Sequence, residues 1–178
     1  MLHFQEYPRD RHAIRDRLSS TRAGFQALLD GLTDDDLRHP SGNPAWTIGA
    51  VLTHLVWSLE LLPREVAGAR QGKGMYNFPP LVRDALNAWA TRLGARGQTL
   101  ESLQRRYDAG FAAALATLDG VAEDEFQLGA RFWSEGFRDI AGLFAGPVDH
   151  LSEHAAHVRV LYPASRGQQA LPGRGKPR

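Results

Sequence analysis

The residues best suited to chemistry in this sequence are histidines near its C-terminal end. Three of the seven histidines, His150, His154 and His157, lie within one short stretch. Residues four apart lie one turn above each other on the same face of an α-helix, so His150 and His154 can direct imidazole nitrogens at one point. This spacing predicts two metal ligands. His157 is interpreted as a residue that supports a ligand or lies at the surface.

Two imidazoles leave a metal ion short of protein ligands, and His54 is the candidate for the third. It lies beside the apolar seam of an earlier helical pattern, much as His150 borders the seam of its own. Three neutral imidazoles would hold Zn²⁺, Ni²⁺ or Fe²⁺ and leave a position for water or substrate. The alternative is a structural bundle with core histidines, because the spacing of His150 and His154 is weak evidence when taken alone.

Four long amphipathic segments are available to position these histidines. The first spans about residues 10–32, the second follows the N-cap residue Thr47, and the third follows the N-cap residue Thr99. The fourth contains the histidines of the C-terminal stretch. Because no strand pattern is convincing, the sequence predicts an all-α protein, a four-helix bundle with long irregular connections.

The connections carry further expectations. Pro63 predicts a kink or an early end of the second helix, and Pro147 either kinks the last helix or restarts it. The loop 68–80 contains Tyr76 and could cover a pocket or anchor itself on the bundle. A short helix is expected at 81–93, and the connection 123–136 is expected to be irregular.

Length and composition favour one domain. We expect a bundle domain over residues 1–163 and a disordered basic tail over 164–178, where four basic residues and no acidic ones occur. Without the tail the chain is mildly acidic, which argues against a nucleic-acid partner. The chain has no cysteine. With no recognisable signal peptide and no apolar run of membrane-spanning length, no membrane partner and a cytoplasmic location are expected.

One set of residues resembles a known family. Trp46-Thr47, six intervening residues and His54, followed about a hundred residues later by His150 and His154 before an apolar helix end, resembles the DinB/YfiT-like superfamily. The resemblance covers about residues 10–162. It implies an unusual four-helix bundle, a divalent metal held by His54, His150 and His154, and frequent homodimers.

The resemblance also suggests a range of activities. Members with assigned functions include mycothiol-dependent maleylpyruvate isomerase and bacillithiol S-transferases, in which the metal would activate a low-molecular-weight thiol. This sequence departs from the family at His157, where relatives often carry Gln or Arg, and no C-terminal partner domain of the isomerase type is recognisable in it. Both differences speak against the isomerase reaction.

The leading hypothesis is therefore a divalent-metal-dependent enzyme with thiol-dependent S-transferase activity on small electrophiles. The cofactors would be the metal and a low-molecular-weight thiol, and the partners a small-molecule substrate and a second copy of the chain. A metal-dependent hydrolase and a non-catalytic protein that binds a small, stress-related molecule in the same bundle cavity are the alternatives. Glu135, Glu153 and Tyr76 are acid or base candidates to which the sequence assigns no role.

Overall fold

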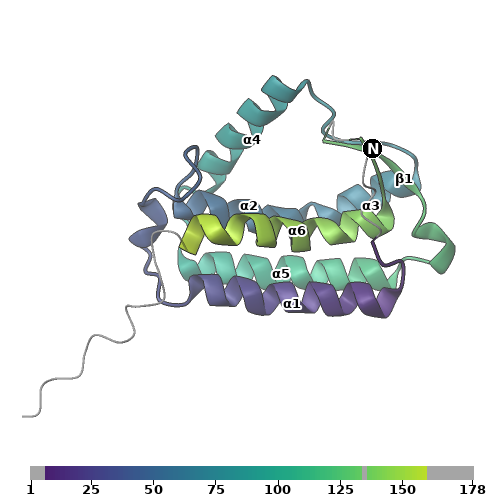
Figure 1. Ribbon diagram of the computed structural model, residues 1–178, viewed down its shortest axis with the longest axis horizontal. Helices are drawn as coiled ribbons and strands as arrows, with labels where there is room; N and C mark the ends of the chain where they lie inside the picture. The colour runs from purple at the N-terminus through teal and green to yellow at the C-terminus, as the bar shows by residue number, and fades with distance from the viewer. Residues whose placement is uncertain (1–6, 134–135, 160–178) are drawn as a thin grey trace, which may run out of the picture.

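Four long helices lie side by side in the computed structural model, which describes residues 7–133 and 136–159 (Figure 1). Both α1 and α2 pack against α5 and α6. The predicted four-helix bundle is thus confirmed, whereas the tail 164–178 lies outside the described residues. The four helices are α1 (Arg11–Leu29), α2 (Ile48–Glu60), α5 (Leu100–Asp119) and α6 (Ile140–Arg159).

Side-chain caps fix where the helices begin. The Thr47 hydroxyl accepts a hydrogen bond of 3.2 Å from the backbone N–H of Ala50, and the Thr99 hydroxyl accepts one of 3.1 Å from Ser102. These bonds satisfy N–H groups that have no partner within the first helical turn. Both predicted N-caps are confirmed, and the cap at Thr47 marks the start of the helix that carries His54.

The core runs along the centre of the bundle. Phe25 of α1 stacks on Tyr107 of α5 with ring centroids 3.9 Å apart, and both side chains are almost fully buried. Apolar residues of α2, which packs on both α5 and α6, belong to the same core, as a seam of three- and four-residue steps favours. The largest of these α2 side chains are Ile48, Leu52, Leu55 and Leu59.

Pro63 and Pro147 have different effects on the helices around them. The α2 helix ends at Glu60, and α3 (Leu62–Arg70) begins at once with Pro63 in its first turn, so the predicted early end is confirmed. Proline is tolerated there because first-turn N–H groups lack helical partners anyway. By contrast, α6 continues through Pro147 without restarting. The N–H of Gly142 donates to the Asp139 carboxylate at 2.8 Å at the start of this helix.

The expectation of an irregular connection at 123–136 without strands was wrong. After the 3-10 turn η2 (Glu123–Glu125), β1 (Gly129–Phe132) and β2 (Gly136–Asp139) pair as an antiparallel hairpin. Each strand has four residues, too few for alternating hydrophobicity to stand out. A Cβ at Gly129 would lie 2.3 Å from the carbonyl oxygen of Arg138, so this close pairing requires glycine.

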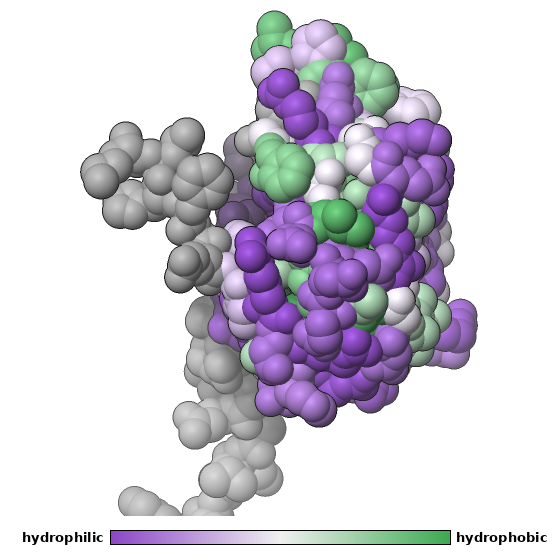
Figure 2. All heavy atoms as spheres, turned by 90° about the vertical axis from the view of Figure 1, so that its right-hand side faces the viewer, coloured by the Kyte–Doolittle hydropathy of each residue, from purple (hydrophilic) through white to green (hydrophobic). Residues whose placement is uncertain are grey.

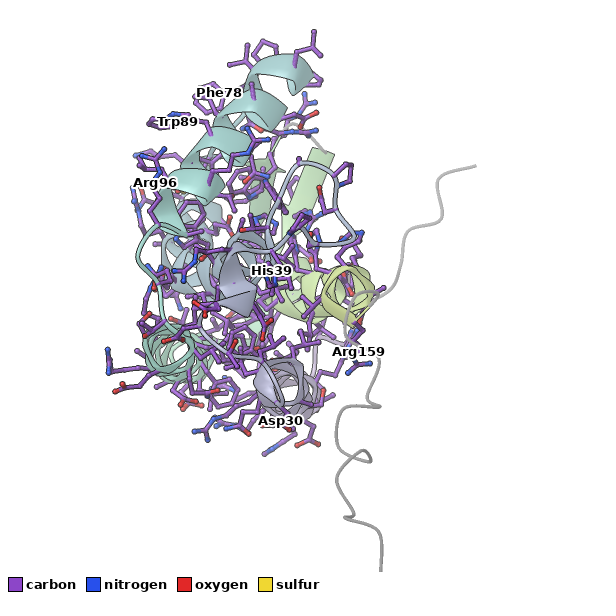
Figure 3. The ribbon with its side chains drawn as sticks, turned by 90° about the vertical axis from the view of Figure 1, so that its left-hand side faces the viewer. Asp30, His39, Phe78, Trp89, Arg96 and Arg159 are labelled. Carbon is purple, nitrogen blue, oxygen red and sulfur yellow. The ribbon has the colours of Figure 1, made fainter. Side chains whose placement is uncertain are left out.

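The helix α4 (Pro80–Gly94) stands apart from the bundle and packs on α2 (Figure 1). It confirms the predicted helix at 81–93. Figure 3 shows that Trp89 lies on the side of α4 that faces away from the bundle, and this side chain is 63% exposed. Other large apolar side chains in α4 or just before it are at least 45% exposed, namely Phe78, Leu81, Val82, Leu86 and Leu93.

The end of the molecule that carries the hairpin is mainly hydrophilic, with a few hydrophobic side chains towards the top of the view (Figure 2). At the other end, the 3-10 turn η1 (Asp36–Arg38) packs against α2. No helix in residues 7–133 and 136–159 combines the length and apolar character needed to cross a membrane.

Candidate metal centre

The structure brings the three histidines singled out from the sequence together. His54 comes from α2, and His150 and His154 come from α6. The ring centroid of His54 lies 5.2 Å from that of His150 and 5.1 Å from that of His154, and the latter two are 6.0 Å apart. Three imidazoles that share one tetrahedral cation at metal–nitrogen distances of about 2.1 Å have centroids roughly 5 Å apart. The spacing of the rings therefore suits a common ion.

The hydrogen bonds of the rings select the nitrogens that remain for ligation. Nδ1 of His150 is 3.0 Å from the carbonyl oxygen of Gly146, and Nδ1 of His154 is 3.0 Å from Nδ1 of His157. Histidine ligands commonly use one nitrogen for such a bond and the other for the metal. Within the described ranges no three His, Asp or Glu side chains are already arranged to hold an ion. Ligation by all three rings would need side-chain rotation.

Burial favours the neutral form of two of the candidate ligands, His54 and His154. The pKa of His54 is lowered to about 3, mainly by burial and in smaller part by the neighbouring His150 and His154. Burial is also the main cause that lowers the pKa of His154 to about 4, with smaller contributions from His150 and His157. Metal binding requires the unprotonated imidazole, so these shifts favour cation binding at neutral pH.

Trp46 lies against the same cluster. Its ring centroid is 4.7 Å from that of His54 and 5.6 Å from that of His154. Among the described residues its indole Nε1 is buried and has no hydrogen-bond partner. An unsatisfied buried donor costs about 1 to 3 kcal/mol, so an acceptor bound among these rings would relieve it. Together with the neutral nitrogen donors, this orphaned N–H fits a site that holds a metal and its accompanying ligand.

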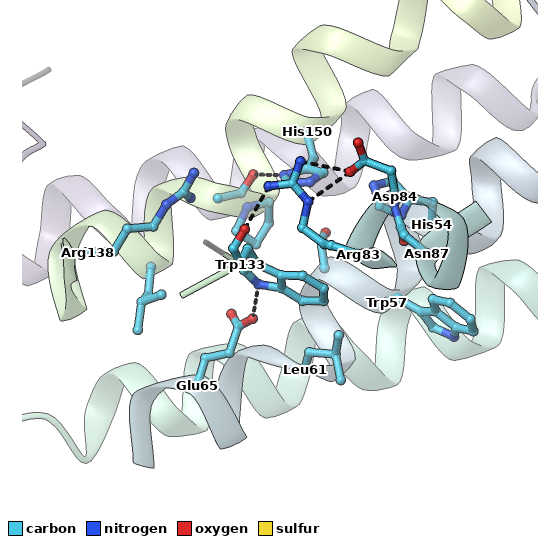
Figure 4. A pocket seen from close by; sticks show the side chains of 14 residues that line it. His54, Trp57, Leu61, Glu65, Arg83, Asp84, Asn87, Trp133, Arg138 and His150 are labelled. Carbon is cyan, nitrogen blue, oxygen red and sulfur yellow. Dashed lines mark hydrogen bonds and ion pairs between the residues drawn. The ribbon is translucent and has the colours of Figure 1, made fainter. Parts of the chain in front are cut away.

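A cavity of about 200 Å³ adjoins the histidines (Figure 4). His54 and His150 contribute to its wall, and the remaining lining comes from α2, α3, α4, α6 and the hairpin. Sequence reasoning missed three of its charged residues, Glu65, Arg83 and Arg138. They come from three different elements, and no spacing along the chain links any of them to the histidines.

Glu65 is the buried acid of this cavity. Its side chain is on α3 and is 8% exposed, and its Oε1 accepts a hydrogen bond of 2.8 Å from Nε1 of Trp133. Burial raises the pKa of Glu65, although the bond from Trp133 opposes that effect. A carboxyl group with a raised pKa inside a cavity is suited to proton transfer.

Neither Tyr76 nor Glu153, two of the acid and base candidates from the sequence, is among the residues that line this cavity. Tyr76 stacks on Trp133 with ring centroids 4.3 Å apart, and its φ of 60° is in the left-handed region. Its loop is thus anchored on a residue that itself lines the cavity. Glu153 is exposed on α6, and Glu135 lies outside the described residues.

Solved structures with the same fold include enzymes. A mycothiol-dependent maleylpyruvate isomerase matches with 14% identity and a TM-score of 0.67, over 89% of this chain and 63% of that one. The chain thus spans less than two thirds of that isomerase. YfiT from Bacillus subtilis, described as a probable metal-dependent hydrolase with an unusual four-helix bundle topology, matches with 15% identity and a TM-score of 0.69, over 90% of each chain. At such identities the likeness establishes the fold alone.

A protein from Streptococcus pneumoniae has the same fold, with 15% identity and a TM-score of 0.68, over 90% of this chain and 93% of that one. No curated protein matches the chain significantly. The model of the DinB superfamily matches residues 17–158, which include all three candidate ligands. The chain therefore belongs to the DinB superfamily.

Proposed function

We propose that this protein is a divalent-metal-dependent enzyme that transfers a low-molecular-weight thiol to a small electrophile, with His54, His150 and His154 as metal ligands. The observation that carries the proposal is the convergence of three imidazole rings, with centroids 5.1 to 6.0 Å apart, beside a cavity that can admit a small molecule.

The chemistry follows from the donor set and the cavity. A divalent cation bound by neutral imidazoles supplies a Lewis acid that lowers the pKa of an adjacent thiol or water. Since the chain has no cysteine, the attacking sulfur has to come from an external thiol. As the new carbon–sulfur bond forms, the electron pair of the broken bond leaves with the departing group. Glu65 is the buried carboxyl of the same cavity, and its proposed role is to donate a proton to that group and to recover a proton from the next thiol.

A metal-dependent hydrolase is the second candidate, in which water replaces the thiol at the same histidines. It is supported by the match to YfiT, which covers 90% of each chain and is described as a probable metal-dependent hydrolase. A protein that only binds a small molecule would use the same cavity without turnover.

Metal analysis tests the site. Protein purified without an affinity tag is expected to contain about one equivalent of a divalent metal, and His54→Ala and His154→Ala should each lose most of it. His12→Ala is the matched control, because His12 is exposed on α1. Stoichiometric metal in the two ligand variants, or none in the unaltered protein, would contradict the proposed centre.

Assays with a panel of electrophiles separate the reactions. The proposal predicts conjugates of a supplied low-molecular-weight thiol, formed by the unaltered protein and not by His54→Ala. Turnover that does not change with added thiol would favour the hydrolase. Tight retention of a compound without product would favour the binding protein.

The oligomeric state, a homodimer, is also a proposal. Along α4, Val82, Leu86, Trp89 and Leu93 recur at steps of four, three and four residues, and each is at least 45% exposed. An exposed apolar helix face of this kind suits a protein interface. A second copy of this chain is the proposed occupant, because the resemblance to the DinB/YfiT-like superfamily implies homodimers.

A further inference from the structure

Trp133 is held at the wall of the cavity by contacts with several elements (Figure 4). Its backbone N–H donates to the carbonyl oxygen of Met75 at 3.1 Å, and its own carbonyl oxygen accepts a bond of 2.7 Å from Nη1 of Arg83 on α4. Its indole Nε1–H donates to Oε1 of Glu65 on α3 at 2.8 Å. These bonds tie Trp133 to three separate parts of the chain and fix the position of its ring.

Tyr76 supports one face of this indole, and the pair is held in an unfavourable backbone conformation. The two ring centroids are 4.3 Å apart, and the ring planes differ by 21°. The φ angles are 60° for Tyr76 and 55° for Trp133, and within residues 7–133 and 136–159 no other residue except glycine has a positive φ. Strain of this kind persists where the surroundings over-determine it, and it is concentrated at ligand-binding and active sites. The strained pair therefore points to a use of Trp133 beyond packing.

One face of the indole is available to the cavity. Of the two stacked rings only Trp133 lines the cavity, so Tyr76 covers the side of the indole that is turned away from it. Apolar side chains of Leu61, Leu143 and Pro147 line the same space. Its volume of about 200 Å³ is below the range of about 300 to 1,000 Å³ that is usual for drug-sized ligands. A molecule with a single ring fits both the size and the lining.

From these contacts we infer that Trp133 is a stacking platform on which the cavity binds a small molecule with one planar aromatic ring. Stacked aromatic rings attract each other beyond the effect of burial, whereas a saturated ring of the same size gains burial alone. Because Tyr76 and Glu65 hold the indole in place before a ligand arrives, binding orders few additional groups. The use of the ring compound as the electrophilic substrate rests on the proposed function, but its binding does not.

Calorimetric titration with benzamide and with cyclohexanecarboxamide tests the inference. Both are neutral amides, and they differ in whether the ring is aromatic or saturated. Each is titrated into the full chain, once after EDTA treatment and once after loading with Zn²⁺. We expect benzamide to bind about 3- to 10-fold more tightly in both preparations. Trp133→Leu should abolish this preference, and Trp133→Phe, which keeps an aromatic ring but no N–H for Glu65, should retain most of it.

Two other tryptophans provide the controls. Trp89→Leu is the matched control, because Trp89 is 63% exposed on α4 and does not line the cavity. It should leave the preference unchanged. Trp57 does line the cavity, and Trp57→Leu should also keep the preference. A preference that is lost in Trp57→Leu but kept in Trp133→Leu would assign the stacking to Trp57 and overturn the inference.

Nuclear magnetic resonance of the indole N–H groups locates the bound ring. The chain has four tryptophans, and the signal that is missing from Trp133→Phe identifies Trp133. Benzamide should shift this signal more than cyclohexanecarboxamide does, because only an aromatic ring carries a ring current, and the signal of Trp89 should stay in place. The measurement is made on the unaltered protein, so it remains decisive if Trp133→Leu fails to fold.

The outcomes separate this inference from the proposed metal enzyme. A preference for the aromatic amide in a protein that never retains metal would uphold the inference and defeat the metal proposal. Stoichiometric metal in a protein with equal affinities for the two amides would defeat the inference alone. An unshifted Trp133 signal, or no binding of benzamide at about 10 mM, would also overturn it.

Discussion

Nδ1 of His154 lies 3.0 Å from Nδ1 of His157, one helical turn further along α6. In such a pair one ring donates and the other accepts, so at least one of the two imidazoles is neutral. The bond occupies Nδ1 of His154 and leaves Nε2 for the cluster that it forms with His54. His157 is thus placed to orient a candidate ligand without reaching the proposed ion.

Replacing His157 should therefore weaken the proposed metal centre without abolishing it. We expect His157→Ala to lower the affinity for Zn²⁺ by about 10- to 100-fold, because the orientation and tautomer of His154 are no longer fixed. His157→Asn should restore part of the affinity, since its amide oxygen can accept a hydrogen bond. Competition with a chromophoric chelator measures the affinities. Unchanged affinity in His157→Ala would show that the pair does not position the ligand.

The buried histidines should make stability depend on pH. The folded pKa of His54 is about 3, below the ordinary value of 6.5, so the unfolded chain binds the proton more readily between these values. The contribution of His54 to the free energy of unfolding is fully present above pH 6.5 and is lost as the pH falls towards 3. Urea unfolding in EDTA should show a loss of roughly 2 to 3 kcal/mol from this residue by about pH 4.5. His54→Gln should flatten the profile, and an identical slope in that variant would contradict the assignment.

Glu65 should produce the opposite slope. Because burial raises its folded pKa above 4.5, the folded chain binds this proton more readily, and stability attributable to Glu65 is lost as the pH rises above 4.5. Glu65→Gln keeps an acceptor for Trp133 and removes the ionisation. We expect the stability of this variant, relative to that of the unaltered protein, to be higher at about pH 8 than at about pH 5. A difference that does not change with pH would show that Glu65 ionises freely.

The α2 helix can approach η1 only because residue 49 is glycine. A Cβ at Gly49 would lie 2.9 Å from the carbonyl oxygen of Leu37, a backbone atom that cannot simply move away. Gly49→Ala should destabilise the protein by about 1 to 3 kcal/mol despite the better helix propensity of alanine. Gly120→Ala is the control, because its Cβ would meet nothing closer than 3.6 Å. Chemical denaturation measures both, and equal stabilities would argue against the close packing at Gly49.

The exposed face of α4 offers a test of assembly. Trp89→Glu places a charge on a side chain that is 63% exposed, in the middle of the apolar face. If this face joins two copies, light scattering after gel filtration should change from the mass of a dimer to that of a monomer. Arg96→Glu changes a charge beyond the end of α4 and serves as the control. A mass of one chain for the unaltered protein would reject the homodimer.

The periodic patterns were sufficient to predict the bundle. Thr47 and Thr99 mark helix starts by their own hydrogen bonds, and Pro63 marks a boundary by the N–H that it lacks, so these features are local and can be recognised in the sequence. The hairpin was missed because strands of four residues carry little pattern and depend on pairing with each other.

The candidate site likewise has one part that could be predicted from the sequence and another that could not. The sequence by itself determined that His150 and His154 share a helix face and that His54 flanks the core of another helix, because helical periodicity fixes the direction of a side chain. Only the tertiary structure decided that Glu65, Arg83 and Arg138 line one cavity beside them. Those three residues belong to elements whose approach is set by packing between distant parts of the chain, and no local rule encodes that packing.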